Sequence, residues 1–192
     1  MEDKKFFKDA LEVILTSVII VFICFKFVFI SAQVDGSSMY PTLIEGDRGY
    51  SFIIKKNLGI KRFDICVIDV KENNKLLVKR IIGMPNETVE YKNNVLYING
   101  QEIAEDFLKD VYTEDIVITL NDDEYYCLGD NRIVSKDSRY YGPFKKEQIK
   151  STGYFIYYPF NRFGIVKWVS LKNKLIDYTL FNLFEKPLFY RC

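Results

Sequence analysis

The sequence has no histidine among its 192 residues. This absence excludes Ser-His-Asp and Cys-His catalysis and every histidine metal site, so acid–base work must fall to lysine, aspartate, glutamate, tyrosine or cysteine. An excess of charge of one sign is also lacking, because 27 Lys and Arg residues offset 26 Asp and Glu residues to a net charge of +1. A chain without a strong positive field shows no sign of nucleic-acid binding.

Cysteine is scarce, with only Cys24, Cys66, Cys127 and Cys192. They form no Cys-x-x-Cys pair, so we expect no zinc site, and they are too few for a disulfide framework. A single bridge between Cys66 and Cys127 stays open, because both lie in strand-like runs. The alternative is that both are small, buried apolar side chains. We expect no metal and no other cofactor.

One long hydrophobic run, residues 13–30, has about the length of a helix that crosses a bilayer. Lys26 interrupts it roughly one helical turn before its end, where a lysine can snorkel to the outer headgroups. A cleavable signal peptide with a cleavage site at Ala32 is one alternative, but its hydrophobic region would usually span only ~7–15 residues. A buried amphipathic helix is another, but the run has no polar face.

The flanks of this run predict its orientation. Three lysines lie within residues 1–12, and after the run no Lys or Arg occurs until Arg48. By the positive-inside rule, residues 1–12 form a cytoplasmic tail, and residues 31–192 lie on the outer face of the plasma membrane.

Beyond the run, short alternating stretches are broken by Gly, Pro, Asn and Asp, which is typical of strands. This pattern predicts a mostly β domain of folded antiparallel sheets or a barrel. The residues around Asn93 and Asn99-Gly100 predict hairpin turns. Residues 171–192 form either a membrane-surface helix or the last packed element. The predicted strands are 49–54, 65–70, 76–82, 88–91, 95–98, 116–120, 124–128 and 153–158.

A candidate nucleophile, Ser38, lies a few residues after the membrane in the stretch GSSMYPTL. A nucleophilic serine needs a tight turn with small neighbours, which Gly36 and Ser37 provide, and Pro41 makes the following chain rigid. By itself, Gly-Ser-Ser is also an ordinary loop.

Two cations, Lys79 and Arg80, lie inside the apolar strand 76–82. Alternation sends them to opposite faces, so one must point to an apolar side, where a charge is costly unless it is lost or paired. Lysine can give up its proton and arginine effectively cannot, which makes Lys79 the candidate base. An edge strand with both cations solvated is the alternative.

The segment 129–142, GDNRIVSKDSRYYG, is too polar for a core yet is flanked by strands. Its density of Asp, Arg, Ser and Asn suits a buried hydrogen-bonded network that holds a loop in place. A plain surface loop is equally compatible with its composition.

Read together, these segments make the chain resemble the bacterial type I signal peptidases of the short Gram-positive kind. The resemblance spans nearly the whole length and rests on four motifs in family order. They are Ser38-Met39-x-Pro41-Thr42-Leu43, Gly46-Asp47, Lys79-Arg80-x-x-Gly83-x-Pro85, and Gly129-Asp130-Asn131-Arg132-x-x-Ser135-x-Asp137-Ser138-Arg139-x-x-Gly142.

The resemblance implies a serine endopeptidase with Ser38 as nucleophile and Lys79 as general base. It implies that Ser135 orients the lysine, and that Asp137 and Arg139 form a supporting ion pair with Asp130 in the same network. The oxyanion hole would use the Ser38 backbone N–H, and Gly36 stands where some members carry a second donor. The accessory β domain of larger relatives should be reduced to hairpins at about residues 86–124.

For Lys79 to act as a base near neutral pH, its pKa must lie well below the usual ~10.4. A nearby carboxylate would oppose this, so we expect Asp130 and Asp137 to bind Arg139 or Arg132 instead.

The resemblance also implies substrates and surroundings. Signal-peptide-bearing preproteins would be cut after an A-x-A pattern, in a lipid bilayer, with the secretion translocon as a further partner. The substrate would add as an extended strand. By family alignment, shallow pockets for its small side chains are formed by Ala32, Val34, Met39, Leu43 and Val78.

Two other functions fit less of the sequence. One is a Ser-Lys protease with another substrate, such as a pilin precursor or a self-cleaving repressor. The other is a non-catalytic, membrane-tethered β module that binds peptides.

Overall fold

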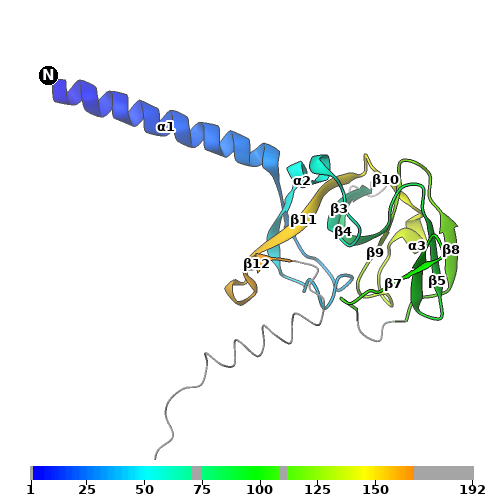
Figure 1. Cartoon of the computed structure of the whole chain (residues 1–192). Helices are drawn as coiled ribbons and strands as arrows, with labels where there is room; N and C mark the ends of the chain where they lie inside the picture. The colour runs from blue at the N-terminus through cyan, green and yellow to red at the C-terminus, as the bar shows by residue number, and fades with distance from the viewer. Residues whose placement is uncertain (1, 71–74, 109–111, 167–192) are drawn as a thin grey trace, which may run out of the picture.

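The computed structural model describes residues 2–70, 75–108 and 112–166. A single long helix, α1 (Glu2–Val28), projects away from a β domain (Figure 1). It is long and apolar enough to cross a membrane, and its most apolar stretch is not buried against the domain. The predicted hydrophobic span 13–30 overshoots this helix, because Phe29 pairs with Phe52 and opens a strand. The predicted C-terminal element, 171–192, lies outside the described residues.

An eight-stranded sheet forms the larger part of the domain, and every pairing in it is antiparallel. This confirms the mostly β prediction. The order along the sheet is β1 (Phe29–Gln33), β2 (Arg48–Phe52), β11 (Ile149–Tyr158), β3 (Ile65–Val70), β4 (Lys75–Gly83), β9 (Glu124–Leu128) and β10 (Phe144–Lys145), with β12 (Gly164–Ile165) on β11.

Short helices connect some of these strands, and the sequence patterns did not predict them. They are α2 (Ile53–Leu58), α3 (Ser138–Tyr141) and the 3-10 turn η2 (Phe160–Arg162). The strands β1, β7, β10 and β12 were missed as well, because two to five residues carry too little alternation to read.

A smaller four-stranded sheet lies at the opposite end of the domain from α1 (Figure 1). Its order is β7 (Gln101–Ile103), β6 (Val95–Ile98), β5 (Thr88–Lys92) and β8 (Ile116–Thr119). Asn93, Asn94, Asn99 and Gly100 take positive φ angles, as tight hairpin turns require. This small sheet lies within the range, about residues 86–124, where the resemblance implied hairpins.

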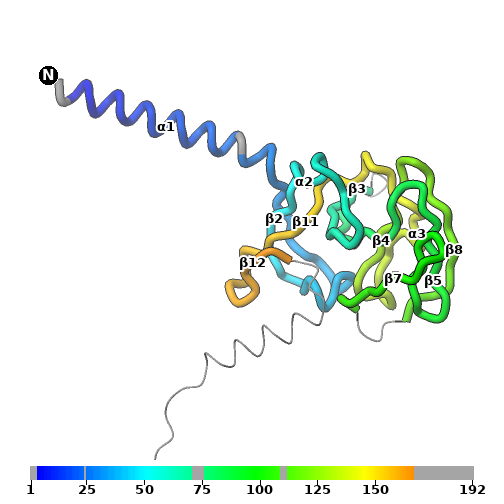
Figure 2. The backbone as a smooth tube through the Cα atoms, in the orientation of Figure 1, coloured from blue at the N-terminus to red at the C-terminus, as the bar shows by residue number. Residues whose placement is uncertain are grey.

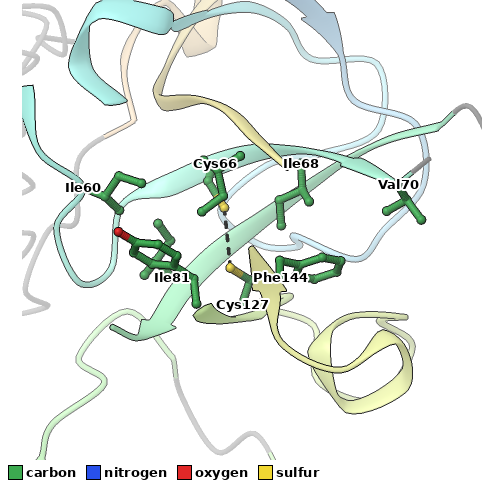
Figure 3. Close-up of a cluster of buried hydrophobic side chains, with 9 residues drawn as sticks. Ile60, Cys66, Ile68, Val70, Ile81, Cys127 and Phe144 are labelled. Carbon is green, nitrogen blue, oxygen red and sulfur yellow. Dashed lines mark hydrogen bonds between the residues drawn. The ribbon is translucent and has the colours of Figure 1, made fainter. Parts of the chain in front are cut away.

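An apolar cluster between β3, β4 and β9 surrounds the two buried cysteines (Figure 3). Cys66 and Cys127 are free thiols with their sulfurs 3.9 Å apart, so no bridge joins them. Ile81 packs between their strands, and Ile60 and Phe144 close the cluster. A second cluster covers the other side of β4 and β9 and joins the large sheet to the small one.

Aromatic rings join the last turn of α1 to the sheet. The centre of the Phe25 ring lies 4.4 Å from that of Phe29 and 5.2 Å from that of Tyr50. The Tyr50 ring also packs on Tyr157 of β11, with their centres 4.8 Å apart. The chain trace in Figure 2 shows that α1 enters the domain beside β2 and β11. This packing fixes the base of the helix to the same sheet that carries the candidate site.

Candidate active site

Ser38 lies in the loop that joins β1 to β2. Gly36 takes a φ of +85°, and the amide of Tyr40 donates to the Ser37 carbonyl, which together make the tight turn that the sequence predicts. The amide of Asn131 donates to the Ser38 carbonyl at 3.0 Å. The segment 129–142 therefore holds the loop of the candidate nucleophile, residues 34–47 (the nucleophile loop), through its backbone.

Lys79 is buried on β4, with only 3% of its surface exposed. Its Nζ donates to Ser38 Oγ at 2.8 Å, so the two residues proposed from the sequence are in direct contact. Burial lowers the pKa of Lys79 and outweighs the opposing pull of the Asp137 and Asp130 carboxylates. A lowered pKa makes the neutral amine, which can accept a proton, more abundant near neutral pH.

The side chains packed around Lys79 explain why its amine is shielded from water. In the strand register Cys66 pairs with Lys79, and Cys127 pairs with Ile81, so all four side chains share one face of the sheet. Thiols and an isoleucine offer the amine no strong countercharge. The pKa of Cys127 is itself raised, chiefly by burial, so this thiol stays neutral.

Arg80 points to the other face of β4 and is also buried, at 1% exposure. It binds the Asp130 carboxylate twice, through Nε at 2.8 Å and Nη2 at 2.6 Å, and donates to the Phe63 carbonyl at 2.9 Å. Thr42 Oγ1 also donates to Asp130. The prediction that Asp130 binds Arg132 or Arg139 is therefore wrong. The reason is register: Leu128 pairs with Arg80, so Asp130 emerges beside the guanidinium.

Asp137 binds Arg139 at 2.9 Å through both Nε and Nη2, as the resemblance implied. Burial alone would raise the pKa of Asp137. Hydrogen bonds from Arg139 and from the Gly129 amide at 3.0 Å, with the Ser135 hydroxyl nearby, outweigh it and leave that pKa below its usual value. The carboxylate is thus held as an anion but is neutralised by Arg139 rather than by Lys79.

Ser135 does not hydrogen-bond to Lys79 in the structure. Its Oγ is buried without a partner of good hydrogen-bond geometry, although it lies near enough to Asp137 to help lower that pKa. A Cβ added at Gly129 would lie 2.2 Å from Ser135 Oγ and 2.5 Å from the Ser38 carbonyl oxygen. Ser135 is therefore close to the backbone of Ser38, and the orienting bond implied by the resemblance is not formed here.

The Ser38 backbone amide donates to none of the described residues. This leaves it able to bind a substrate oxygen, as an oxyanion hole requires. No Cβ stands at Gly36, and the space around that position is open within 4 Å.

All five predicted pocket residues meet in one cluster. Val34, Met39 and Leu43 are buried in it, and Ala32 and Val78 are partly buried against it. Tyr154 supports this cluster from β11 and donates its hydroxyl to the Ala32 carbonyl at 2.8 Å. The sequence reasoning missed Tyr154, because an isolated tyrosine in a strand carries no special signal.

Two further ion pairs around the site also escaped sequence reasoning. Arg162 binds Asp47 through Nε and Nη2 at 3.0 Å and donates to the Thr42 carbonyl, so η2 supports the nucleophile loop. Arg132 binds Glu105 at 2.5 Å. Both pairs join segments more than 25 residues apart, and no local pattern links them.

Comparisons with known proteins point to one family. Residues 7–158 match the family described as signal peptidase, peptidase S26. Signal peptidase I S of Bacillus subtilis (strain 168) is 38% identical over 172 residues, which cover 82% of this chain and 92% of that protein. Signal peptidase I of Streptococcus pneumoniae (strain ATCC BAA-255 / R6) is 32% identical over 179 residues, which cover 72% of this chain and 86% of that protein.

Among solved structures, a signal peptidase I from Enterococcus faecalis V583 shares 37% sequence identity with this chain. The match covers 49% of this chain and 96% of the solved one, with a TM-score of 0.47. The family match spans most of the described residues, and the relatives are covered over most of their own length. The chain therefore belongs to the signal peptidase, peptidase S26, family.

Proposed function

We propose that this chain is a membrane-bound serine endopeptidase that removes signal peptides from exported preproteins, with Ser38 as nucleophile and Lys79 as general base. The observation that carries the proposal is the 2.8 Å contact between Lys79 Nζ and Ser38 Oγ. The contact lies where burial lowers the pKa of the amine. A hydroxyl beside a neutral amine in a dry site is an activated nucleophile.

In the first step, Ser38 Oγ attacks the scissile carbonyl carbon and passes its proton to Lys79 Nζ. The carbonyl oxygen gains the negative charge and is stabilised by the Ser38 N–H. When the C–N bond breaks, Lys79 gives the proton to the departing amine. The signal peptide remains as an ester on Ser38, and the mature protein leaves with a new N-terminus.

In the second step, water attacks the ester and Lys79 takes one of its protons. The ester bond breaks, the proton returns to Ser38 Oγ, and the signal peptide leaves with a new carboxylate. Lys79 is therefore neutral before each attack and protonated in each tetrahedral intermediate. This is the role that histidine plays in other serine proteases, filled here by the amine.

Two free strand edges support binding of an extended substrate. β1 ends the order of the large sheet, and β4 pairs with β9 only from Arg80 onward, so residues 76–79 are paired on one side only among the described strands. Ala32 of β1 and Val78 of β4 pack against one cluster, which brings these edges close together. A peptide between them would place alternate small side chains, as in A-x-A, over Val34 and Met39.

The membrane part of the proposal rests on α1 and its flanks. Residues 1–12 would stay in the cytoplasm and residues 31–192 on the outer face, because the lysines cluster before the apolar stretch. Exposed aromatics at one end of β11 and on η2, among them Phe160 at 81% exposure, would sit at the lipid surface. A preprotein emerging from the bilayer, or from the translocon, would then meet the groove directly.

The test is cleavage of a signal-bearing preprotein by the full-length protein in lipid vesicles, with the N-terminus of the product sequenced. Ser38→Ala and Lys79→Met should each abolish cleavage, and Lys55→Met, at a partly exposed lysine paired with Asp64, should not. Retained cleavage by either dyad variant would overturn the assignment. Peptide binding without any cleavage by the unaltered protein would favour the non-catalytic module.

A further inference from the structure

Arg132 is a completely buried cation whose hydrogen bonds run to the small sheet. Its side chain has no exposed surface. Nη2 donates to Glu105 Oε1 at 2.5 Å, and Nη1 donates to Thr113 Oγ1 at 2.8 Å and to the Tyr91 hydroxyl at 3.0 Å. Tyr91 belongs to β5, and Glu105 and Thr113 lie between β7 and β8. The small sheet and its connection therefore supply the countercharge and two of the acceptors of this guanidinium.

The other end of Arg132 reaches the nucleophile loop through one residue. Its Nε donates to the Gly129 carbonyl at 3.0 Å. Gly129 is packed so closely against Ser38 that an added Cβ would lie 2.5 Å from the Ser38 carbonyl oxygen, and its amide donates to Asp137. A shift of Arg132 would therefore be transmitted through the Gly129 peptide to the backbone of Ser38.

The same connection contacts the second buried arginine of the site. Phe107 lies against Arg80, with the guanidinium carbon 4.1 Å from the ring centre, and also packs on Phe63. Arg80 holds Asp130, which directly follows Gly129. Two side chains of one segment, Glu105 and Phe107, thus support the two arginines on either side of the Gly129-Asp130 peptide.

Glu105 is the anionic partner of Arg132, so the position of Arg132 depends on the charge of Glu105. A guanidinium cannot lose its proton, so a buried one must keep a countercharge or draw in water. Although burial alone would lower the pKa of Arg132, Tyr91 and Glu105 raise it above its ordinary value, so the cation is held firmly in place. Removing the charge of Glu105 would free the guanidinium to turn toward solvent and away from Gly129.

We propose that Glu105 is a positioning residue for Ser38, acting through Arg132 and Gly129, and that the small sheet serves to hold it there. The inference rests on the proposed role of Ser38 and Lys79. It assigns to the small sheet and to Glu105 a part in setting the geometry of the reacting atoms, beyond adding a hydrophobic core. Thr113 supports the same guanidinium without carrying charge.

A second ion pair between the two sheets provides a matched control. Arg62 Nη2 binds Glu87 Oε1 at 2.5 Å, the same length as the Arg132–Glu105 contact, and Glu87 lies just before β5. This pair also joins the small sheet to the rest of the domain. Arg62 also donates to the Ile82 carbonyl and Glu87 also accepts from the Met84 amide, and neither of these residues belongs to segment 129–142.

The experiment compares Glu105→Gln with Glu87→Gln in the full-length protein in lipid vesicles. Both should lower thermal stability, and rates are compared per folded molecule. Glu105→Gln should lower kcat about 10-fold or more with little change in KM. It should slow acylation of Ser38 by a serine-reactive reagent to the same degree. It should also move the acid limb of the pH–rate profile to higher pH. Water that enters beside Ser38 would solvate Lys79 and raise its pKa. Glu87→Gln should leave all three unchanged.

Equal kcat, acylation rate and pH profile in the two variants would overturn the inference, since Glu105 would then be merely structural. Thr113→Val removes one hydrogen bond to Arg132 and leaves no charge unpaired. It should show a smaller effect of the same kind, and it replaces Glu105→Gln if that variant does not fold. If the unaltered protein does not cleave, or Ser38→Ala still does, the proposed function fails instead.

Discussion

The two faces of β4 treat a buried cation in opposite ways. On one face Lys79 meets thiols and isoleucine and has Ser38 Oγ as its hydrogen-bond acceptor at 2.8 Å. On the other face Arg80 makes two hydrogen bonds to Asp130 and one to a backbone carbonyl, and its guanidinium also lies against an aromatic ring. The two residues are adjacent in sequence and both are less than 4% exposed. Burial by itself therefore does not decide whether a cation is reactive.

The difference lies in the countercharge. The guanidinium of Arg80 is paired with Asp130 and fixes it in place, and Arg139 does the same for Asp137. With both carboxylates engaged elsewhere, burial outweighs their pull on Lys79, and its pKa falls. One face of β4 thus maintains the structure, and the other maintains an amine that can exchange a proton.

The largest effect should come from removing the reactive cation. We expect Lys79→Met to lower kcat/KM by about 10⁴-fold, because Ser38 loses its base. The same change should leave the protein as stable as before or up to about 1 kcal/mol more stable at pH 7, because a buried amine is replaced by an apolar chain. Preprotein cleavage and urea unfolding in detergent measure the two quantities. A strong loss of stability would mean that Lys79 is structural, like Arg80.

Removing the paired cation should mainly unfold the protein. Arg80→Met leaves Asp130 buried without its partner, and we expect a loss of about 3–5 kcal/mol in the free energy of unfolding. Adding Asp130→Asn should recover part of this loss, because the orphaned charge is gone. Unfolding midpoints of both variants decide the matter. If Arg80→Met were as stable as the unaltered protein, the contrast between the faces would be lost.

Adding a side chain at Gly129, which is packed against Ser38, should have an intermediate effect. Gly129→Ala brings a methyl group against Ser135 Oγ and the Ser38 carbonyl, at distances of 2.2 and 2.5 Å before any adjustment. We expect a loss of about 1–3 kcal/mol in stability, with reduced acylation of Ser38. A second change, Ser135→Gly, should restore part of the stability, since it clears one of the two contacts. Normal acylation in Gly129→Ala would show that Ser38 tolerates displacement.

The smallest effect should be a dependence of stability on pH. Since the pKa of Lys79 is lowered on folding, the folded protein binds fewer protons than the unfolded chain between that lowered pKa and the ordinary value of about 10.4. Lys79 should then make stability rise with pH in this window, by at most about 1.4 kcal/mol per pH unit. Unfolding measured from pH 7 to 10 should show this slope, and Lys79→Met should lack it. The cleavage rate should rise with pH as the amine loses its proton. A slope that survives in Lys79→Met would have another source.

Much of the fold was readable from local patterns. The apolar stretch of α1, the eight predicted strands and the hairpin turns at Asn93 and Asn99 are all present, because alternation, length and turn residues act within a few positions. The ends of the elements could be predicted less accurately from local patterns. The predicted strand 49–54 runs too far, because β2 ends at Phe52 and the next residues begin α2. The helix stops at Val28 because Phe29 finds Phe52 across the sheet, which no local pattern reveals.

The partners within the site were only partly readable. Asp137 and Arg139 are two residues apart, so their pairing could be expected from the motif. Asp130 was assigned to the wrong arginine because Arg80 lies 50 residues away in sequence. The bond from Ser135 to Lys79 was expected from the resemblance, but the packing around Gly129 leaves Ser135 Oγ without it.

The sequence by itself determined the kind of chemistry that is available. The absence of histidine, a lysine inside an apolar strand and a small-residue turn around Ser38 make a hydroxyl and an amine the candidate reactive groups. Only the tertiary structure decided that these groups touch and that the amine has a lowered pKa. Both depend on strand register, which chooses each residue's neighbours from distant parts of the chain, and on the amount of water that those neighbours exclude.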